Sequence, residues 1–442
     1  MRAPTIIHLP ATLPPSSPPT PPITSKPTSI LLSRSDSLSP TTTGPQPRRK
    51  NYLIYFITGN PGLIGYYDLF LSYLHLSLAD RLPPSTQVNF DVFGRSLSGF
   101  ESEARGGFLR RRSAPGGGYP AEAAGGRGAG LRPGARPPFG LEEQIKGAEW
   151  ALWDHVQGLR EQAQEQGDFD PRFEDDDEPN IILVGHSVGA YIAMEILRRW
   201  REKLAVAGSK DDDEEPKGKI VGAVSLFPTV AHIAKSDSGK KFATLFQIPY
   251  IPLILHLLAT LLTFWLPSAL FFQLVQLFMP EDAARTTTSF VKSRNGIRQA
   301  LHMAREELRI ITDDKWDAEL WGAASPSPLL QPRPKMYFLF GRQDHWVADS
   351  TRDDLIASRG RASPNSNSNY TDSGSTTPTM TAPRMTCSSS SRASSEPADD
   401  DWKPVMEIID EIPHGFCVEP RHSAAVAEKV VEYVCEMVRA QS

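Results

Sequence analysis

Nearly uninterrupted apolar runs recur along the chain and alternate with segments whose apolar residues have helical spacing. Residues 51–58 (NYLIYFIT) are rich in aromatic and β-branched side chains, which is typical of a strand buried on both faces. Residues 142–162 (EEQIKGAEWALWDHVQGLREQ) have the spacing of an amphipathic helix. Because strands separated by helices form parallel sheets, the pattern predicts an α/β fold with a doubly wound, mostly parallel sheet and ligands at the carboxyl ends of its strands. The predicted strands are residues 51–58, 87–94, 180–185, 219–228, 335–341 and 405–413.

Four segments interrupt this alternation and suggest the domain organisation. Residues 1–50 hold 12 of the 39 prolines among many Ser and Thr residues, so we expect them to be disordered. They lack the long apolar run of a secretory signal, although their scarcity of acidic residues leaves a transit peptide open. The remainder, residues 51–442, fits one domain in which residues 229–330 form an inserted cap. Three further segments are predicted to be disordered insertions in surface loops: residues 102–140, 205–218 and 358–401.

Charge and cysteine content narrow the class of protein. The formal net charge is −5 and the isoelectric point is near 6.1, which argues against a dedicated nucleic-acid partner. Three cysteines cannot form a disulfide framework, and no Cys/His cluster indicates structural zinc. These features favour an intracellular, reducing compartment.

The segment GHSVG joins a predicted strand to a predicted helix, the context that a nucleophile elbow requires. The glycines, Gly185 and Gly189, allow a tight turn and the close approach of neighbouring backbone. His186 and Ser187 form the turn itself, which lifts the Ser187 hydroxyl above the sheet edge. The backbone N–H of Val188 then lies at a helix N-terminus, where it can stabilise an oxyanion. The simpler alternative is a serine at a glycine-rich helix start.

A nucleophilic serine needs a base and an acid that orients it, and this fold class orders them as Ser, acid and His. Asp344 follows the predicted strand at residues 335–341, and His414 follows the last predicted strand. Ser187, Asp344 and His414 are therefore the candidate catalytic residues. The rivals are Asp349, Asp353, Asp354, His345 and His422, which are worse placed relative to the strand ends or to the proposed acid.

The second oxyanion donor usually comes from the loop after the first core strand. The turn GNPG follows residues 51–58, so Asn60 or its immediate neighbours are the candidates for this donor. The alternative is that GNPG is a simple proline turn.

Taken together, these motifs resemble the lipid droplet-associated hydrolase family of α/β-hydrolases. The resemblance is carried by YFITGNPGLIGYY, ILVGHSVGAYIAMEIL, SLFPT, FLFGRQDHW and IPHGFCV, which extend over most of the predicted ordered chain. It implies an α/β-hydrolase fold, a triad at Ser187, Asp344 and His414, and an association with lipid droplets. One residue departs from the family pattern: Thr58 stands where members often have Pro, which puts the detail of the oxyanion loop in doubt but not the triad.

Between Lys241 and Glu281 the sequence contains no Asp, Glu, Lys or Arg. Four prolines divide this apolar segment, and its longest uncut piece, Leu253–Leu266, spans about 21 Å as a helix, short of a bilayer core. Two short helices broken at Pro267 suit a hairpin that dips into one leaflet or a lipid monolayer. The alternative is an apolar cap folded over the active site, and the two interpretations are compatible.

The sequence therefore predicts a serine esterase that cleaves a hydrophobic lipid ester through an acyl-enzyme, a reaction that requires no cofactor and no metal. The resemblance implies the surface of lipid droplets, with the endoplasmic reticulum membrane as a further site on the cytosolic face, and a sterol ester as substrate. Two alternatives stay open from the residues. One is a droplet-surface organising protein with little turnover, and the other is an acyltransferase or thioesterase that uses the same nucleophile.

Overall fold

The structure is a computed structural model, and it describes residues 29–33, 50–82, 86–100, 136–165, 179–207, 218–322, 333–361 and 402–441. Most of residues 1–50 and most of the three expected insertions lie outside these ranges.

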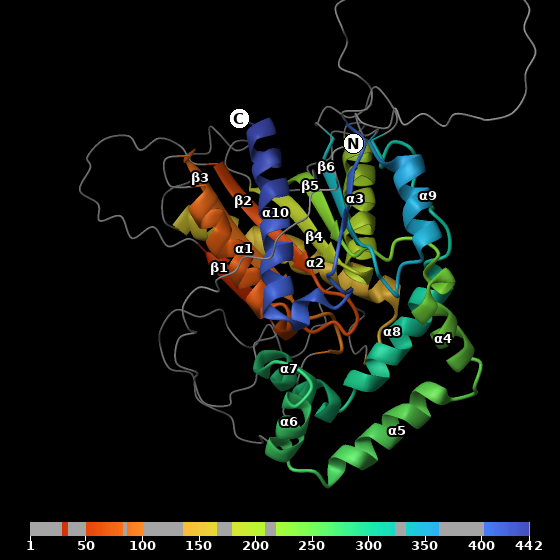
Figure 1. The fold of residues 1–442 in the computed structure, drawn as a ribbon. Coiled ribbons are helices and arrows are strands. Elements are labelled where there is room, and N and C mark those ends of the chain that lie inside the picture. Colours follow the sequence, from red (N-terminus) through yellow and green to blue (C-terminus); the bar gives the residue numbers. More distant parts are fainter. Residues whose placement is uncertain are drawn as a thin grey trace, which may run out of the picture.

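A seven-stranded sheet forms the centre of the described chain (Figure 1). The strand order is β1-β3-β2-β4-β5-β6-β7, and every neighbouring pair is parallel except β1 with β3. The predicted doubly wound, mostly parallel sheet is confirmed. The strands are β1 Ser29–Ser33, β2 Lys50–Ile57, β3 Val88–Arg95, β4 Asn180–His186, β5 Lys219–Leu226, β6 Lys335–Gly341 and β7 Val405–Ile409.

Strand β1 corrects the expectation that residues 1–50 lack structure. Its five residues pair antiparallel with the edge of β3, so that Ile30 is opposite Gly94. The side chain of Ile30 is buried and that of Leu31 is exposed, as expected for a strand that covers one edge of a sheet. A short strand between proline-rich segments is too brief to give a recognisable alternation in the sequence.

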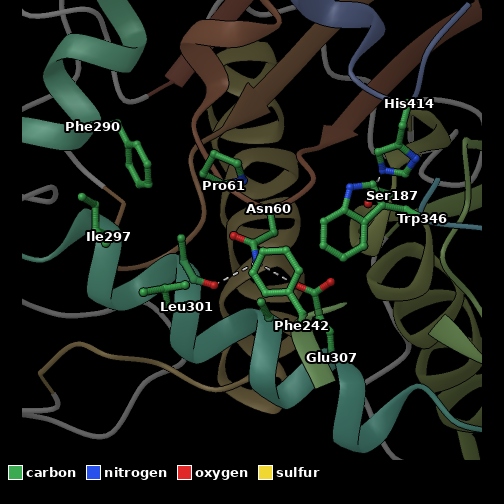
Figure 2. A pocket seen from close by; sticks show the side chains of 12 residues that line it. Asn60, Pro61, Ser187, Phe242, Phe290, Ile297, Leu301, Glu307, Trp346 and His414 are labelled. Carbon is green, nitrogen blue, oxygen red and sulfur yellow. Dashed lines mark hydrogen bonds between the residues drawn. The ribbon is translucent and has the colours of Figure 1, made fainter. Parts of the chain in front are cut away.

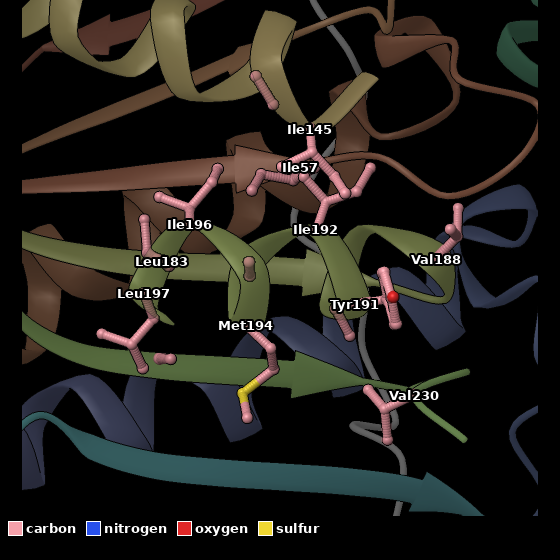
Figure 3. Packing of buried hydrophobic residues seen from close by; sticks show 14 of the residues in the cluster. Ile57, Ile145, Leu183, Val188, Tyr191, Ile192, Met194, Ile196, Leu197 and Val230 are labelled. Atoms are coloured by element: carbon pink, nitrogen blue, oxygen red, sulfur yellow. The ribbon is translucent and has the colours of Figure 1, made fainter. Parts of the chain in front are cut away.

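Helices cover both faces of the sheet, and each face has its own apolar core. Along β2, Leu53, Tyr55 and Ile57 belong to one core, whereas Tyr52 and Ile54 belong to the other. This explains why the strand sequence is apolar without alternation. Figure 3 shows the packing of α3 against β4 and its neighbours on the first face. The covering helices are α2 Leu141–Glu165, α3 Val188–Ala207 and α9 Asp349–Arg359 on that face, and α1 Asp68–Arg81 and α10 Pro420–Ala440 on the other.

Some borders of the expected insertions differ in the structure. Helix α3 continues through Ala207, and helix α9 through Arg359, so both overlap segments that were expected to be disordered. Phe139 is buried, and its backbone exchanges two hydrogen bonds with the Gln299 side chain. Phe139 therefore docks on the cap and is not part of a solvated insertion.

In the described residues between β5 and β6, five α-helices form an insert within the range predicted for the cap. Figure 1 shows α5 and α6 at the end of the molecule farthest from the sheet. The axes of α5 and α6 differ by 108°, as expected for two short helices broken at Pro267. In the described chain no single helix is long and apolar enough to cross a membrane, although this bent pair passes such a test when taken together. The helices are α4 Asp237–Leu245, α5 Ile251–Phe264, α6 Ser268–Gln276, α7 Glu281–Lys292 and α8 Gly296–Ile310.

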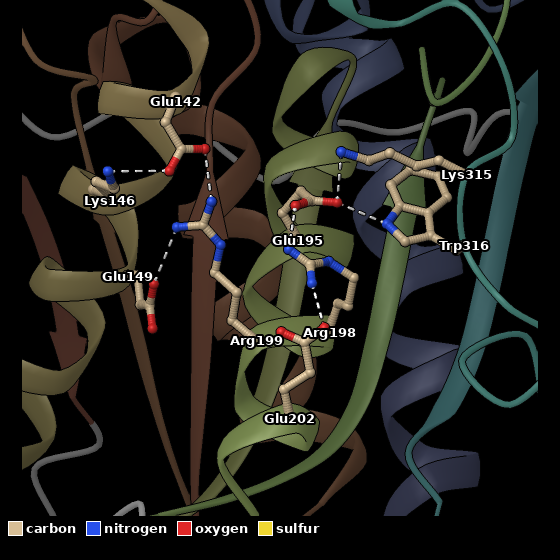
Figure 4. A network of polar contacts seen from close by, with 9 residues as sticks. All are labelled: Glu142, Lys146, Glu149, Glu195, Arg198, Arg199, Glu202, Lys315 and Trp316. Atoms are coloured by element: carbon tan, nitrogen blue, oxygen red, sulfur yellow. Dashed lines mark hydrogen bonds and ion pairs between the residues drawn. The ribbon is translucent and has the colours of Figure 1, made fainter.

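Polar contacts fix the returning end of the insert on α3 (Figure 4). The buried carboxylate of Glu195 accepts a hydrogen bond from Trp316 Nε1 at 2.8 Å and pairs with Lys315 Nζ at 3.0 Å. On the other side of α3, Arg199 pairs with Glu142 of α2 at 2.7 Å. The helix that follows the candidate nucleophile is thereby held to both of its neighbours.

Candidate active site

Ser187 lies between the last residue of β4 and the first residue of α3, at the carboxyl edge of the sheet. Its backbone has φ of +55°, a conformation that costs free energy for a non-glycine residue and is typical of functional turns. Its N–H donates to the carbonyl of Leu226 at 2.9 Å, which ties the turn to the end of β5. The turn therefore has the geometry of a nucleophile elbow.

The two glycines of GHSVG are required by close backbone contacts. A Cβ atom on Gly185 would lie 2.3 Å from the carbonyl oxygen of Gly189. A Cβ atom on Gly189 would lie 2.3 Å from the carbonyl oxygen of Ile57, at the end of β2. Since real Cβ contacts are never this short, any other residue at either position would displace the turn.

Ser187, His414 and Asp344 form one chain of hydrogen bonds. Ser187 Oγ is 2.9 Å from His414 Nε2, and His414 Nδ1 is 2.8 Å from Asp344 Oδ2. The other carboxylate oxygen of Asp344 accepts the N–H of Trp346 at 2.8 Å, which fixes its orientation. All three side chains are buried. With Asp344 ionised, Nδ1–H donates to the carboxylate and leaves Nε2 free to accept the serine proton.

The structure does not bring the rival residues into this chain. Asp349 and Asp353 bind the guanidinium of Arg352, and His422 belongs to the first turn of α10. The ring centroid of His345 is 6.1 Å from that of His414, without a hydrogen bond between them in the described chain.

The two candidate oxyanion positions lie at the same site: Val188 follows Ser187 in the chain, and Asn60 lines the same pocket. Val188 is the first residue of α3, so its N–H belongs to the first turn, where backbone donors have no intrahelical partner. Asn60 follows β2 and lines the same pocket as Ser187 and His414. The neighbouring Gly59 N–H is already donated to Tyr67 Oη at 3.1 Å.

A buried network under the site involves His186 and Tyr67. Tyr67 Oη is 2.7 Å from His186 Nδ1, and His186 Nε2 is 2.9 Å from the carbonyl oxygen of His414. Burial holds the pKa of His186 well below its ordinary value, with a smaller electrostatic contribution from the neighbouring His414 side chain, so the ring is neutral. A carbonyl only accepts, so the proton is on Nε2, and Nδ1 accepts the O–H of Tyr67. The network links the loop of Gly59, the elbow and the loop of His414.

Sequence reasoning gave no role to Tyr67. Tyr67 is the second residue of the YY pair shortly after GNPG, which is the only sequence signal for it.

Beside the Ser–His–Asp chain lies a pocket of about 310 Å³ (Figure 2). Helix α8 supplies one wall, and Phe242 of α4, Phe290 of α7 and Trp346 supply other apolar surfaces. Its walls are therefore mostly carbon, and a hydrophobic molecule would lose little on entering it. Among the residues described, no group of three or more His, Cys, Asp or Glu side chains is arranged to hold a metal ion.

One carboxyl group in this pocket was not anticipated from the sequence. Glu307 of α8 is only 4% exposed and accepts a hydrogen bond from Asn60 Nδ2 at 2.9 Å, while the same nitrogen donates to the Ala300 carbonyl at 3.0 Å. Burial raises the pKa of Glu307 to about 8, only partly offset by the Asn60 hydrogen bond. A signal did exist in the sequence: Gln299, Met303 and Glu307 are spaced by four and share the buried face of α8.

The sequence profile of the family described as lipid-droplet associated hydrolase matches residues 50–375. The chain belongs to this family. The resemblance of this chain to the family, inferred from the motifs, is thus confirmed. The chain has the α/β-hydrolase fold. The lipid droplet-associated hydrolase of Gallus gallus is 23% identical over 309 residues, covering 69% of this chain and 73% of the relative. The protein of the same name in Dictyostelium discoideum is 22% identical over 313 residues, covering 69% of this chain and 76% of the relative.

Solved structures of other hydrolases also align with this chain at low identity. The haloalkane dehalogenase DbeA of Bradyrhizobium elkani aligns with a TM-score of 0.43 and 9% identity, covering 93% of this chain and 99% of that one. Carboxyl esterase 2 of the fungus Tuber melanosporum aligns with a TM-score of 0.39 and 12% identity, covering 92% of this chain and 85% of that one.

Proposed function

We propose that this protein hydrolyses hydrophobic carboxylic esters at a lipid surface, through an acyl-enzyme on Ser187. The observation that carries the proposal is the hydrogen-bonded chain from Ser187 Oγ through His414 to Asp344, which opens on an apolar pocket. Membership of a hydrolase family supports it. We infer that this chemistry belongs to one domain, which includes strand β1 besides the expected residues 51–442 and has residues 229–330 as its cap.

In the first half of the reaction, Ser187 Oγ attacks the ester carbonyl and its proton passes to His414 Nε2. Asp344 stabilises the imidazolium through Nδ1–H. The backbone N–H groups of Val188 and Asn60 are the proposed donors to the oxyanion. When the tetrahedral intermediate collapses, the carbon–oxygen bond to the alcohol breaks and His414 returns the proton to the departing alcohol.

In the second half, His414 takes a proton from water as the water oxygen attacks the acyl-serine carbonyl. The bond between the acyl carbon and Ser187 Oγ then breaks, and the proton returns from His414 to the serine. The products are a carboxylic acid and an alcohol, and the enzyme is regenerated with no cofactor and no metal in any step.

The exposed surface of the cap supports docking on lipid. Of the 17 large apolar side chains that are exposed in the described chain, 14 lie between residues 248 and 278. Burial of each such side chain contributes about 1.5–3 kcal/mol when complete, so several together anchor a protein firmly. These side chains face outward, which favours docking over the alternative of a cap that only closes on the site. They are Ile248, Tyr250, Leu253, Ile254, Leu257, Leu258, Leu261, Leu262, Phe264, Trp265, Leu270, Leu274, Leu277 and Phe278.

The proposed location is the surface of lipid droplets, with the cytosolic face of the endoplasmic reticulum membrane as a second site. Both relatives are named for their association with lipid droplets, and a droplet monolayer accepts a shallow hairpin such as α5–α6. The proposed substrate is a water-insoluble ester drawn from that surface, of the sterol ester kind.

The experiment that tests this function is covalent labelling with a fluorophosphonate, together with the release of fatty acid from emulsified esters. Wild-type protein should be labelled and Ser187→Ala should not, whereas Ser238→Ala of the cap should be labelled like wild type. Labelling of Ser187→Ala would contradict the nucleophile assignment. Labelling without acid release would favour a droplet-organising role, and transfer of the acyl group to added alcohol would favour an acyltransferase.

A further inference from the structure

Two polar groups stand apart in the apolar pocket. Glu307 and Asn60 line it together with Ser187 and His414, but neither side chain belongs to the Ser–His–Asp chain. The pocket surface around them is mostly apolar, with Leu301 and residues of the neighbouring cap helices among its members. Figure 2 shows the Asn60 amide between the Glu307 carboxyl and helix α8. A site that excludes water keeps polar groups for a reason of structure or of recognition.

The hydrogen bonds of this pair are incomplete. Both bonds recorded for the Asn60 side chain are donated by Nδ2, to Glu307 Oε1 and to the Ala300 carbonyl. Asn60 Oδ1 is buried and has no donor within the described part of the chain. The carboxyl of Glu307 is mostly neutral at pH 7, since its pKa is raised to about 8, so it also carries an O–H. The amide nitrogen of Asn60 cannot accept that proton.

One buried acceptor and one buried donor, on two residues that line the pocket, therefore have no partner within the described part of the chain. A buried polar group without a partner costs about 1–3 kcal/mol. A hydroxyl group is the simplest partner for both, because it donates one hydrogen bond and accepts another. An ester without a hydroxyl would leave both groups unpaired when it displaces water from the pocket.

We propose that Asn60 Oδ1 and the Glu307 carboxyl form a subsite for a free hydroxyl group on the ester substrate. The inference rests on the proposed function and changes its substrate class: a simple sterol ester has no free hydroxyl, so it would be a poorer substrate than an ester that keeps one. It points to an ester that keeps a hydroxyl on its alcohol part, such as a partial glyceride, or on its acyl part, such as a hydroxy acid ester. A fully apolar ester is a poorer substrate for the same serine.

Matched ester pairs test the subsite in the full-length protein. Glycerol monobutanoate is compared with propyl butanoate, which lacks only the hydroxyls on the alcohol side. Ethyl hydroxybutanoate is compared with ethyl butanoate for the acyl side. The quantity measured is the ratio of kcat/KM within each pair. We expect a ratio of about 10 or more in one pair, which also tells which part of the ester carries the hydroxyl, since tenfold corresponds to about 1.4 kcal/mol.

Variants of Glu307 separate recognition from mere positioning of the Asn60 loop. Glu307→Met should bring the ratio close to 1, whereas Glu307→Gln, which still donates and accepts, should keep most of it. Glu306→Gln is the matched control, because Glu306 is the adjacent residue of α8 and pairs with Arg309 outside the pocket. That control should leave both kcat/KM values at the wild-type level.

A kcat/KM ratio near 1 in both ester pairs for the wild type would overturn the subsite. It would also be overturned if Glu307→Met lowered kcat/KM equally for both esters of a pair. If no ester is cleaved, the proposed function fails, and the subsite is then tested by ligand binding alone. Glycerol monobutyl ether should raise the melting temperature of wild-type protein more than butyl propyl ether does. The difference should vanish in Glu307→Met, and equal shifts in the wild type would reject the subsite.

Discussion

The central sheet and the α5–α6 hairpin are both strongly apolar in sequence, but the apolar side chains of the sheet are buried and many of those of the hairpin are exposed. In β2 and β4 the apolar side chains are buried between helices on both faces. In the hairpin, Leu262 is 67% exposed, Trp265 is 81% exposed and Phe278 is 86% exposed. Hydrophobicity alone therefore does not decide whether the side chains of a segment are buried or exposed, because that depends on the elements that surround it.

The two regions also divide the proposed tasks. The Ser–His–Asp chain is on loops that follow β4, β6 and β7, whereas the exposed leucines lie on the cap. Helices α7 and α8 border both regions, since each contacts α5 and contributes a residue, Phe290 or Glu307, to the pocket. Substitutions in the Ser–His–Asp chain should therefore leave lipid docking intact, and substitutions of the exposed leucines should leave ester cleavage intact.

The largest effect should come from Ser187→Ala or His414→Ala. Each should lower kcat on a soluble ester by about 10³–10⁶-fold, and the double variant should lose little more, because the residues act as one unit. Binding to lipid droplets should be unchanged, since the hairpin is untouched. The measurements are ester turnover and droplet flotation of the same preparations. An equally large loss in His422→Ala would show that the wrong histidine was chosen as the base.

The next effect concerns the hairpin. Replacement of Leu257, Leu258, Leu261 and Leu262 by Ser should release the protein from droplets by at least about 100-fold, because each exposed leucine contributes about 1.5–3 kcal/mol on full burial in lipid. Turnover of a soluble ester should remain within a few-fold of wild type. Flotation and turnover are again measured together.

The matched control for the hairpin is Leu76→Ser, since Leu76 is an exposed leucine of α1, on the sheet side of the molecule. It should float like wild type. If the four-leucine variant still floats, these side chains are not the lipid contact. If it loses both flotation and turnover, the hairpin is part of the folded core and the division between the two regions fails.

The sheet could be predicted from the sequence because a strand buried on both faces leaves an uninterrupted apolar run, as in residues 51–58. The positions of Ser187, Asp344 and His414 could also be predicted, because the fold fixes which strand ends meet at one edge. Each of these inferences uses a local pattern or a topological rule. Strand β1 could not be predicted, because five residues in a proline-rich segment give no such pattern.

The polar contacts within the site could not be predicted in the same way. Glu307 and Asn60 are 247 residues apart, and their contact depends on how the cap packs against the loop after β2. In the sequence of α8, Glu307 follows another glutamate, so the sequence predicts a solvent-exposed, charged side chain. Tyr67 and His186 are 119 residues apart. Such pairs follow from tertiary packing, which periodicity does not encode.

A smaller effect is expected for the network that joins the loops of the site. Tyr67→Phe removes the O–H to His186 and the acceptor of the Gly59 N–H, leaving two buried groups unpaired. We expect kcat to fall about tenfold with KM little changed, and the melting temperature to fall. The control is Tyr73→Phe in α1, which should change neither. A rise in KM without a change in kcat would mean that the network serves substrate binding and does not position the reacting groups.

The last effect is a pH dependence of stability at Glu307, which should change kcat less than any of the preceding variants. The pKa of this carboxyl is about 8 in the folded protein and near 4.5 when the chain is unfolded, so between these values the folded state binds a proton that the unfolded state does not. Stability therefore falls as pH rises through this window, by at most about 1.4 kcal/mol per pH unit, and levels off above about 8. Glu307→Gln cannot ionise. Its melting temperature relative to that of wild type should therefore rise by a few degrees between pH 6 and 8 and should rise no further above that range. Melting curves of both proteins across this range measure the difference, with Glu306→Gln as the control that should follow wild type. A constant offset between Glu307→Gln and wild type at every pH would mean that the carboxyl is already ionised in the folded state, and that the pocket is wetter than its apolar walls indicate.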